Sequence, residues 1–248
     1  MFEFVPVNLK CTNLEDAWVR SMYHAISIGR PYLVTEGSRA GQHRLTMDVA
    51  HININHPELR PLYPTGKPGQ VVPIDEKAIT QYFENYVYSD SPPKPDEHYN
   101  YSEYIYPLAN AIMDYYRKFG PGNAHCSIRV GSPNCFLDYF EAYKDETSRK
   151  TTPCLLTIDT RIIDNHLCFY VYYRSWDLFS GFPLNMAGFQ LLKETMSGYI
   201  GVENGPTVAV CKDLHLYEED IPAAAGWTCQ DVSFLIQDLK EKRNAPQR

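Results

Sequence analysis

No apolar run in this 248-residue chain comes near the roughly 18 residues that a membrane-spanning helix needs, so such a helix is excluded. The N-terminal segment 1–5 lacks a basic and an apolar stretch, and we therefore expect no signal peptide. The seven cysteines contain no CxxC pair, and no Cys/His cluster has the spacing of a zinc site. We expect reduced cysteines and a cytoplasmic protein.

Positive charge is also scarce, because 23 Lys and Arg residues stand against 30 Asp and Glu residues, for a net charge of −7. This balance argues against a surface that coats nucleic acid, but it allows a small anionic ligand held by a few arginines. Apolar residues make up 44% of the chain and charged residues 21%, which is typical of a globular protein. The length and the mixed helix and strand patterns predict a single α/β domain over residues 1–248.

The hydrophobic periodicity predicts the order of the elements. We predict helices over residues 12–29, where Thr12-Asn13-Leu14-Glu15 is a capping box, and over 74–88, 104–119, 184–199 and 230–240. We predict strands over residues 44–55, with a bulge near Ile52, and over 126–130, 155–163, 166–173 and 207–217. Asp164-Asn165 indicates a hairpin turn, residues 131–150 read as an irregular charged insertion, and the tail 241–248 reads as frayed.

One cysteine stands where catalytic side chains are often found. Cys154 lies between a charged loop and a predicted strand, at the mouth of that strand. Arg174 and Ser175 follow at the end of the next strand, where both can donate hydrogen bonds to a phosphate, and an arginine near a cysteine favours the thiolate. Two alternatives stay open for each: an inert buried cysteine or a nucleophile, and a surface ion pair or a phosphate site.

Further polar residues also have two interpretations. Asn185 follows a turn forced by Gly181 and Pro183, where it is either a helix N-cap or an amide that reads the edge of a planar base. His215 and Tyr217 alternate on a strand and share a face. They are either a half-buried aromatic pair or two polar tips that reach a ligand hydroxyl.

Taken together, these segments resemble thymidylate synthase. The motifs Pro153-Cys154, Tyr173-Arg174-Ser175-x-Asp177, Gly181-x-Pro183-x-Asn185 and Asp213-x-His215-x-Tyr217 follow one another in that family's order and nearly at its spacing. The resemblance implies a large twisted mixed sheet flanked by helices, and a homodimer formed through that sheet. It also implies a transferase that moves a one-carbon unit from 5,10-methylenetetrahydrofolate to carbon 5 of a pyrimidine nucleoside monophosphate, with neither nucleic acid nor membrane as a partner.

The resemblance also implies a role for each matching residue. Cys154 is the nucleophile, Asn185 reads the base, and Asp177 faces the folate. Arg39, Arg174 and Ser175 hold the phosphate, while His215 and Tyr217 reach the sugar. Glu84 in Tyr82-Phe83-Glu84 is the acid–base residue, with Glu76 as its competitor, and Tyr101 in Tyr99-Asn100-Tyr101 is the active-site tyrosine, which with Tyr217 is a candidate to remove the carbon 5 proton.

The sequence departs from the family pattern in several places. Asn123-Ala124-His125, with Arg129 nearby, stands where the family has two adjacent arginines that reach the partner subunit's site. Leu155 replaces the histidine common after the cysteine, no tryptophan occurs from residue 19 to 175, and the tail 245–248 does not match the family's closing segment. Missing tryptophans favour access of water and a hydroxymethyl product over a methyl product.

Two questions stay open at this level. Asn185 favours a uracil-type base, but an amide can flip, so cytosine is not excluded. The alternative function is a catalytically silent member of the fold that binds a nucleotide. The retention of Cys154 together with Arg174, Ser175 and the residues after them argues against that alternative.

Overall fold

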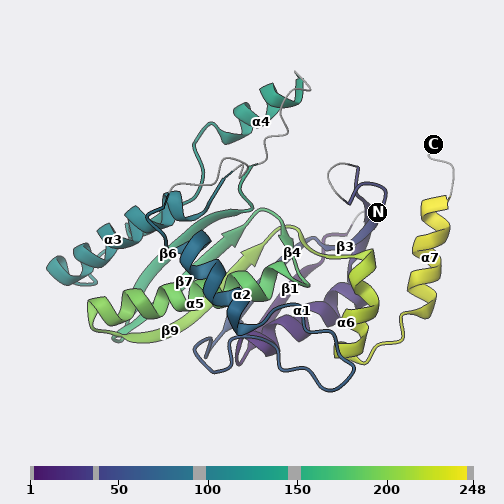
Figure 1. Ribbon diagram of the computed structural model, residues 1–248, viewed down its shortest axis with the longest axis horizontal. Coiled ribbons are helices and arrows are strands. Elements are labelled where there is room, and N and C mark those ends of the chain that lie inside the picture. Colours follow the sequence, from purple (N-terminus) through teal and green to yellow (C-terminus); the bar gives the residue numbers. More distant parts are fainter. Residues whose placement is uncertain (1–2, 36–38, 92–98, 145–151, 245–248) are drawn as a thin grey trace.

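The structure is a computed structural model that describes residues 3–35, 39–91, 99–144 and 152–244. Helices and strands alternate along the chain, which confirms the mixed α/β class (Figure 1). No helix in these ranges is long and apolar enough to cross a membrane. Gly37 and Ser38 of the predicted arginine loop and the tail 245–248 lie outside the described residues.

The strands form two mixed sheets rather than one. The larger sheet has the order β1 (Pro6–Cys11), β4 (Val49–Ile54), β9 (Glu203–Cys211), β7 (His166–Tyr173), β6 (Leu155–Ile163) and β5 (Ser127–Arg129). The smaller sheet has the order β2 (Arg30–Leu33), β3 (His43–Met47), β10 (Leu214–Tyr217) and β8 (Trp176–Asp177). Parallel pairs, such as β1 with β4 and β7 with β9, alternate with antiparallel pairs, such as β6 with β7.

Three strands of the larger sheet pass almost directly into strands of the smaller one. Only Asp48 separates β3 from β4, only Arg174 and Ser175 separate β7 from β8, and only Lys212 and Asp213 separate β9 from β10. Because β4, β9 and β7 are neighbours, as are β3, β10 and β8, the three breaks lie side by side. We call this line of breaks the seam. It divides the single predicted sheet in two, and it carries part of the motif that contains Arg174.

The seam also corrects two strand predictions. The stretch 44–55 changes sheets at Asp48, and no register shift occurs within β4, so the predicted bulge near Ile52 is wrong. The change of apolar parity there comes from the passage between sheets. The predicted strand 207–217 is likewise two strands, and β9 begins earlier than predicted, at Glu203.

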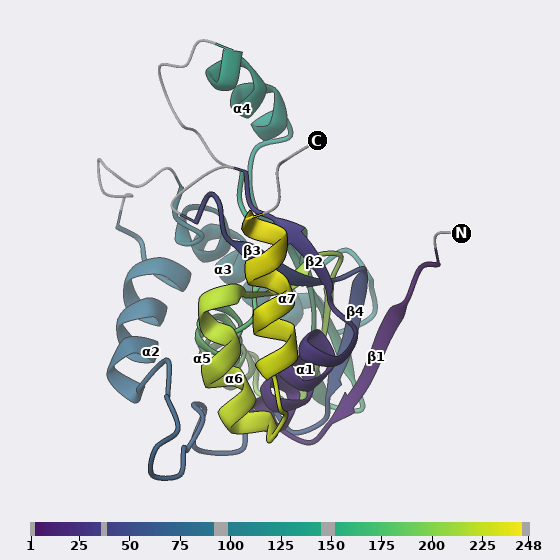
Figure 2. The same ribbon diagram turned by 90° about the vertical axis from the view of Figure 1, so that its right-hand side faces the viewer.

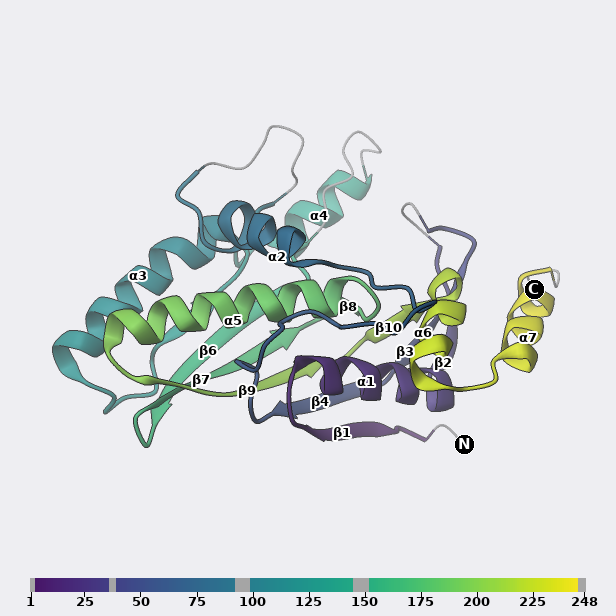
Figure 3. The ribbon, with the colours of Figure 1, turned by 60° about the horizontal axis from the view of Figure 1, so that its bottom comes forward.

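Helices cover one face of the larger sheet (Figures 2 and 3). α1 (Leu14–Ile28) and α5 (Gly181–Ile200) pack on it, and α3 (Ser102–Phe119) contacts its edge strand β5. Asn13 is the N-cap of α1, since its side chain accepts a hydrogen bond from the Asp16 amide at 2.9 Å. The cap is therefore one residue later than the predicted capping box.

Other helices differ from the prediction. α2 (Glu76–Tyr82) runs into a π-helical turn, η1 (Phe83–Val87), where one helix was predicted. α4 (Cys135–Lys144) lies in the segment predicted to be irregular, and its Phe136 and Phe140 rings stack one turn apart. A 3₁₀ turn η2 (Glu218–Asp220) and α6 (Ile221–Thr228) precede α7 (Ser233–Asn244), which begins later than predicted.

The other face of the larger sheet bears the outward positions of the strands. The register places Tyr172 beside Thr157 on one side and Val210 on the other, with His51 next in the row. Tyr170 and Tyr172 are each 39% exposed, whereas the alternate residue Val171 is buried among the core residues on the helix side. This outward face is therefore partly apolar.

Candidate active site

Cys154 lies half-buried immediately before β6 and is held by Arg174. The Arg174 amide donates to the Cys154 carbonyl at 2.9 Å. The Arg174 guanidinium donates from Nε to the Pro153 carbonyl at 2.9 Å and from Nη2 to the Thr152 carbonyl at 2.6 Å. The antiparallel pairing of β6 with β7 thus brings together the cysteine and the arginine that the sequence predicted as a pair. The arginine grips the segment that presents the thiol.

A group of tyrosines surrounds the cysteine. The Tyr101 hydroxyl accepts a hydrogen bond from the Leu155 amide at 3.3 Å, and the Tyr99 ring stacks on the Tyr101 ring, with 5.5 Å between the centroids. Burial, reinforced by neighbouring tyrosines and Cys154, raises the pKa of both tyrosines far above the usual range, so both stay neutral. The Tyr173 hydroxyl is buried without a hydrogen-bond partner among the described residues. Tyr99 and Tyr173 were not among the predicted site residues, although both lie in motifs that contain one.

Asn185 is not the N-cap of α5, because that position is Ser180 and its side chain makes no cap hydrogen bond. The Asn185 amide instead donates from Nδ2 to the Tyr82 hydroxyl at 2.7 Å, and its Oδ1 accepts from the Trp176 indole at 2.8 Å. The Asn185 side chain therefore connects α2, which contains Tyr82, with β8, which contains Trp176. Neither Tyr82 nor Trp176 was predicted as a contact of Asn185.

Asp177 secures the start of α5. Its Oδ1 accepts from the Phe179 amide at 3.1 Å, and its Oδ2 accepts from the Ser180 hydroxyl at 2.6 Å and the Gly181 amide at 3.1 Å. An acidic side chain is favourable at a helix N-terminus. The side-chain hydrogen bonds that the structure shows for Asp177 are therefore with the turn that leads into α5, and a folate contact stays a prediction.

Asp213 joins the polar groups along the seam. Its Oδ2 accepts from the Ser175 hydroxyl at 2.7 Å and from Arg44 Nη2 at 3.0 Å. Burial acts to raise the pKa of Asp213, but His215, Ser175 and Arg44 favour its charged form and lower the pKa below the usual value. The carboxylate is therefore ionised, and it joins β3 to the connection between β7 and β8. Arg44 and Asp213 were not predicted as site residues, although Asp213 opens the last motif.

One ring nitrogen of His215 has no hydrogen-bond partner among the described residues. Its Nδ1 lies 3.0 Å from the Asp213 carbonyl oxygen, so Nδ1 carries the donated proton. Its Nε2 is buried and has no hydrogen-bond partner in the described part of the chain. The Tyr217 ring meets His215 edge-on, with 4.8 Å between the ring centroids. The two side chains are thus neighbours, as their alternation on β10 predicted, and a hydroxyl ligand would satisfy the free nitrogen.

Arg39 lies over the Tyr217 ring, with 4.2 Å from the guanidinium carbon to the ring centroid. It forms ion pairs with Glu219 and, at 3.7 Å, with Asp220. Burial and the charge of Asp177 raise the pKa of Asp220 to about 6, while Arg39 opposes the rise. A phosphate on Arg39 would therefore compete with two carboxylates.

The two predicted acids, Glu84 and Glu76, are both exposed to solvent, Glu84 on the η1 turn and Glu76 in the first turn of α2. Neither carboxylate makes a hydrogen bond to the described residues around Cys154. Arg129 is exposed on β5, and the Asn123 side chain accepts from the His125 amide at 2.8 Å, within a turn.

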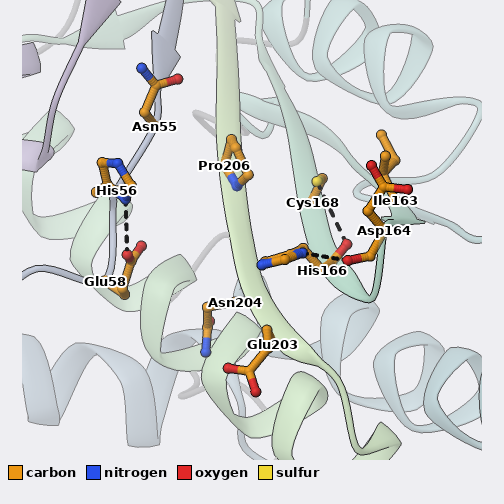
Figure 4. A pocket seen from close by; sticks show the side chains of 10 residues that line it. All are labelled: Asn55, His56, Glu58, Ile163, Asp164, His166, Cys168, Glu203, Asn204 and Pro206. Carbon is orange, nitrogen blue, oxygen red and sulfur yellow. Dashed lines mark hydrogen bonds and ion pairs between the residues drawn. The ribbon is translucent and has the colours of Figure 1, made fainter.

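A cavity of about 830 Å³ lies away from the residues around Cys154 (Figure 4). It is lined by Asn55, His56, Glu58, Ile163, Asp164, His166, Cys168, Glu203, Asn204 and Pro206. It lies at the end of β6 and β7 opposite to Cys154 and contains none of the predicted site residues. Within the described ranges, no group of three or more His, Cys, Asp or Glu side chains could hold a metal ion.

Comparison with known proteins agrees with the motif order. Residues 138–230 match the family model of thymidylate synthase. The chain is 31% identical over 75 residues to the "Putative thymidylate synthase" of Methanosarcina acetivorans, covering 30% of this chain and 35% of that protein. It is 32% identical over 78 residues to the thymidylate synthase of Listeria monocytogenes, covering 32% of this chain and 25% of that protein. The resemblance of the C-terminal half to thymidylate synthase is therefore confirmed, while the alignments span about a third or less of each relative.

Proposed function

We propose that this protein transfers a one-carbon unit from 5,10-methylenetetrahydrofolate to carbon 5 of a pyrimidine nucleoside monophosphate, through a covalent adduct of Cys154. The match of residues 138–230 to thymidylate synthase supports this reaction class. The observation that carries the proposal is the contact of Arg174 with the segment that presents Cys154, because it joins a nucleophile to an anion-binding side chain.

The first step is attack of the Cys154 thiolate on carbon 6 of the pyrimidine. A sulfur–carbon bond forms, and the electron pair of the carbon 5–carbon 6 double bond moves toward carbon 5, which becomes nucleophilic. Arg174 uses Nε and Nη2 to fix the backbone before Cys154 and leaves Nη1 without a hydrogen bond to any described residue. Nη1 is therefore available to a phosphate oxygen.

Carbon 5 then bonds to the methylene carbon and loses its proton. Tyr101 is placed to relay this proton, because its hydroxyl lies at the backbone beside Cys154 and stays neutral. The family resemblance gives Glu84 the acid–base role. Because its carboxylate is exposed on η1, we assign the proton transfer between Glu84 and the base to intervening water molecules. Elimination of the folate leaves an exocyclic methylene, which takes either a hydride from the folate or a water oxygen, and Cys154 then leaves carbon 6.

The remaining side chains match the other parts of the nucleotide. Arg39 and Ser175 join Arg174 at the phosphate, and Tyr217 and the free Nε2 of His215 reach a sugar hydroxyl. Asp177 faces the folate beside Tyr217. The Trp176 ring stacks on Tyr173, with 3.8 Å between the centroids, and its indole donates a hydrogen bond to Asn185. Trp176 therefore does not replace the missing tryptophans of the folate pocket. Their absence favours the hydroxymethyl branch.

The test is release of tritium from carbon 5 of labelled UMP, dUMP, CMP and dCMP in the presence of 5,10-methylenetetrahydrofolate. We expect release with at least one nucleotide, and none from Cys154→Ala. The methyl branch converts the folate to dihydrofolate, because it donates a hydride, whereas the hydroxymethyl branch leaves tetrahydrofolate; product mass separates them. Nucleotide binding without release identifies the silent alternative, and neither binding nor release refutes both.

A further inference from the structure

We propose that Trp176 fixes the orientation of the Asn185 amide, and that this makes the site select a pyrimidine with a carbonyl at carbon 4 over one with an amino group there. The inference rests on the proposed function and names the base that the site accepts. Trp176 acts through Asn185 and is therefore a positioning residue.

The contacts of the Asn185 side chain identify its two amide atoms. An indole nitrogen can only donate a hydrogen bond, so the Asn185 atom that lies 2.8 Å from Trp176 Nε1 must be the oxygen. The other amide atom is then the nitrogen, which lies 2.7 Å from the Tyr82 hydroxyl oxygen. Chemistry fixes this orientation, because the alternative sets two donors against each other.

Part of the hydrogen-bonding capacity of the Asn185 amide remains for a ligand. Asn185 Oδ1 has two lone pairs and Nδ2 has two protons, and the contacts with Trp176 and Tyr82 use one of each. One N–H donor and one oxygen lone pair remain for a ligand. Uracil offers a carbonyl at carbon 4 and an N–H at position 3, which match that donor and acceptor. Cytosine offers an amino group and a bare nitrogen, which match only the flipped amide.

Of the two neighbours, Trp176 is the one that prevents the Asn185 amide from flipping. Tyr82 carries a hydroxyl, which can donate as well as accept, so it tolerates either amide orientation. Burial raises the pKa of Tyr82 well above its usual range, so that hydroxyl keeps its proton. Trp176 has no such freedom. A flipped amide would leave its buried N–H facing the Asn185 nitrogen without an acceptor.

The packing holds both neighbours in place. Trp176 is 3% exposed, and its ring lies nearly parallel to Tyr173, with the centroids 3.8 Å apart, and 4.7 Å from Phe182. The Tyr82 ring lies against α5 at Gly188, where an added Cβ would come within 2.7 Å of Tyr82 Cδ1. The clamp of Trp176, Asn185 and Tyr82 is therefore built into the core.

The test measures binding of UMP, CMP, dUMP and dCMP by calorimetry to the full chain and its variants. The ratio of the uracil to the cytosine dissociation constant within each sugar pair isolates the base. We expect the wild type to prefer uracil and Trp176→Phe, which keeps an aromatic ring but removes the N–H, to reduce that preference roughly tenfold or more. Tyr82→Phe should retain most of the preference. Trp227→Phe is the matched control, because its indole bonds to the Val71 carbonyl elsewhere in the molecule.

A second readout needs no nucleotide. The chain has three tryptophans, so the Trp176 indole N–H resonance can be assigned in a nitrogen-15 spectrum by comparison with Trp176→Phe. We expect Asn185→Ala to shift this resonance and to leave that of Trp227 in place. This measurement also tests the clamp if Trp176→Phe fails to fold.

The outcomes separate the two proposals. Uracil preference that is unchanged in Trp176→Phe, or a Trp176 resonance that does not respond to Asn185→Ala, overturns this inference and leaves the proposed function standing. A wild type that prefers cytosine also overturns the inference alone. A wild type that binds none of the four nucleotides overturns the proposed function and the inference with it.

Discussion

At the scale of single residues, Arg174 contacts the segment before Cys154 and is also the proposed ligand of the phosphate. Two of its three guanidinium nitrogens already hold the Pro153 and Thr152 carbonyls. The guanidinium is therefore held in position by hydrogen bonds to two backbone carbonyls. Arg39 is instead paired with Glu219 and Asp220, so a phosphate gains less by binding to Arg39. The structure thus favours Arg174 as the stronger phosphate contact.

We predict that Arg174→Ala weakens nucleotide binding by about tenfold or more, since a charged hydrogen bond contributes roughly 1.5–3 kcal/mol. Binding of the matching nucleoside, measured by the same calorimetry, should hardly change. Arg174→Lys retains a charge but cannot reproduce both carbonyl contacts, so it should recover affinity better than it recovers tritium release. Arg60→Ala, which removes an exposed arginine that is paired with Glu194, is the control. Equal losses for nucleotide and nucleoside would show that Arg174 is only structural.

Asp220 gives a prediction about pH. Its pKa is raised to about 6 in the folded protein, from 3.8, so the fold favours the protonated form. The stabilising contribution of this group is complete below pH 3.8 and is lost as the pH rises through about 6. Asp220→Asn should therefore be more stable than the wild type at pH 8, by at most about 3 kcal/mol, and similar to it at pH 4.

Thermal unfolding at both pH values measures this difference. Glu219→Gln removes a half-exposed carboxylate that helps to raise the pKa of Asp220, so in that background the pH-dependent gap between Asp220 and Asp220→Asn should be smaller. A stability gain for Asp220→Asn that is as large at pH 4 as at pH 8 would rule out titration of Asp220 as its cause.

At the scale of elements, the sequence predicted the features that depend on residues close together in the chain. The apolar stripe of α5 and the Asp164-Asn165 hairpin are written in consecutive residues, and both are present, with Asp164 and Asn165 at positive φ. The seam is different, because Asp48 and Asp213 mark breaks only in relation to neighbouring strands. The clamp on Asn185 was missed for the same reason, since Tyr82 lies 103 residues away in the chain.

Two glycines of α5 give a matched pair for testing how this helix supports the site. At Gly188 an added Cβ would lie 2.7 Å from Tyr82 Cδ1 and 3.3 Å from Val87 Cγ2, whereas at Gly198 it would meet nothing within 4 Å. We predict that Gly188→Ala destabilises the protein by about 1–3 kcal/mol through overpacking. Gly198→Ala should stabilise it by up to about 1 kcal/mol, because alanine favours the helix.

Denaturant unfolding of both variants measures these opposite signs. Gly188→Ala should also shift the Trp176 indole resonance, since a displaced Tyr82 no longer holds the far side of the Asn185 amide. If both variants are stabilised to the same extent, the close packing of Tyr82 on α5 is not a constraint in solution.

At the scale of the whole molecule, the larger sheet separates two surfaces with different tasks. Helices α1 and α5 cover one face of the sheet (Figure 3). The first turn of α5 lies next to the seam, where the candidate active site is. The opposite face presents Tyr170 and Tyr172, with Val208 and Val210 beside them in register. Partly exposed aromatic side chains in the middle of a sheet are suited to cover by another apolar surface.

We predict that this face joins two copies of the chain in a homodimer. In a twofold interface each residue occurs twice, so a single substitution is repeated across the axis. Tyr172→Lys should weaken the dimer roughly a hundredfold or more, because it buries two like charges, while Tyr23→Lys on the exposed side of α1 should leave it unchanged. Light scattering over a range of micromolar concentrations measures both variants against the wild type. A monomeric mass for the wild type, or equal effects of the two substitutions, would show that copies do not meet through this face.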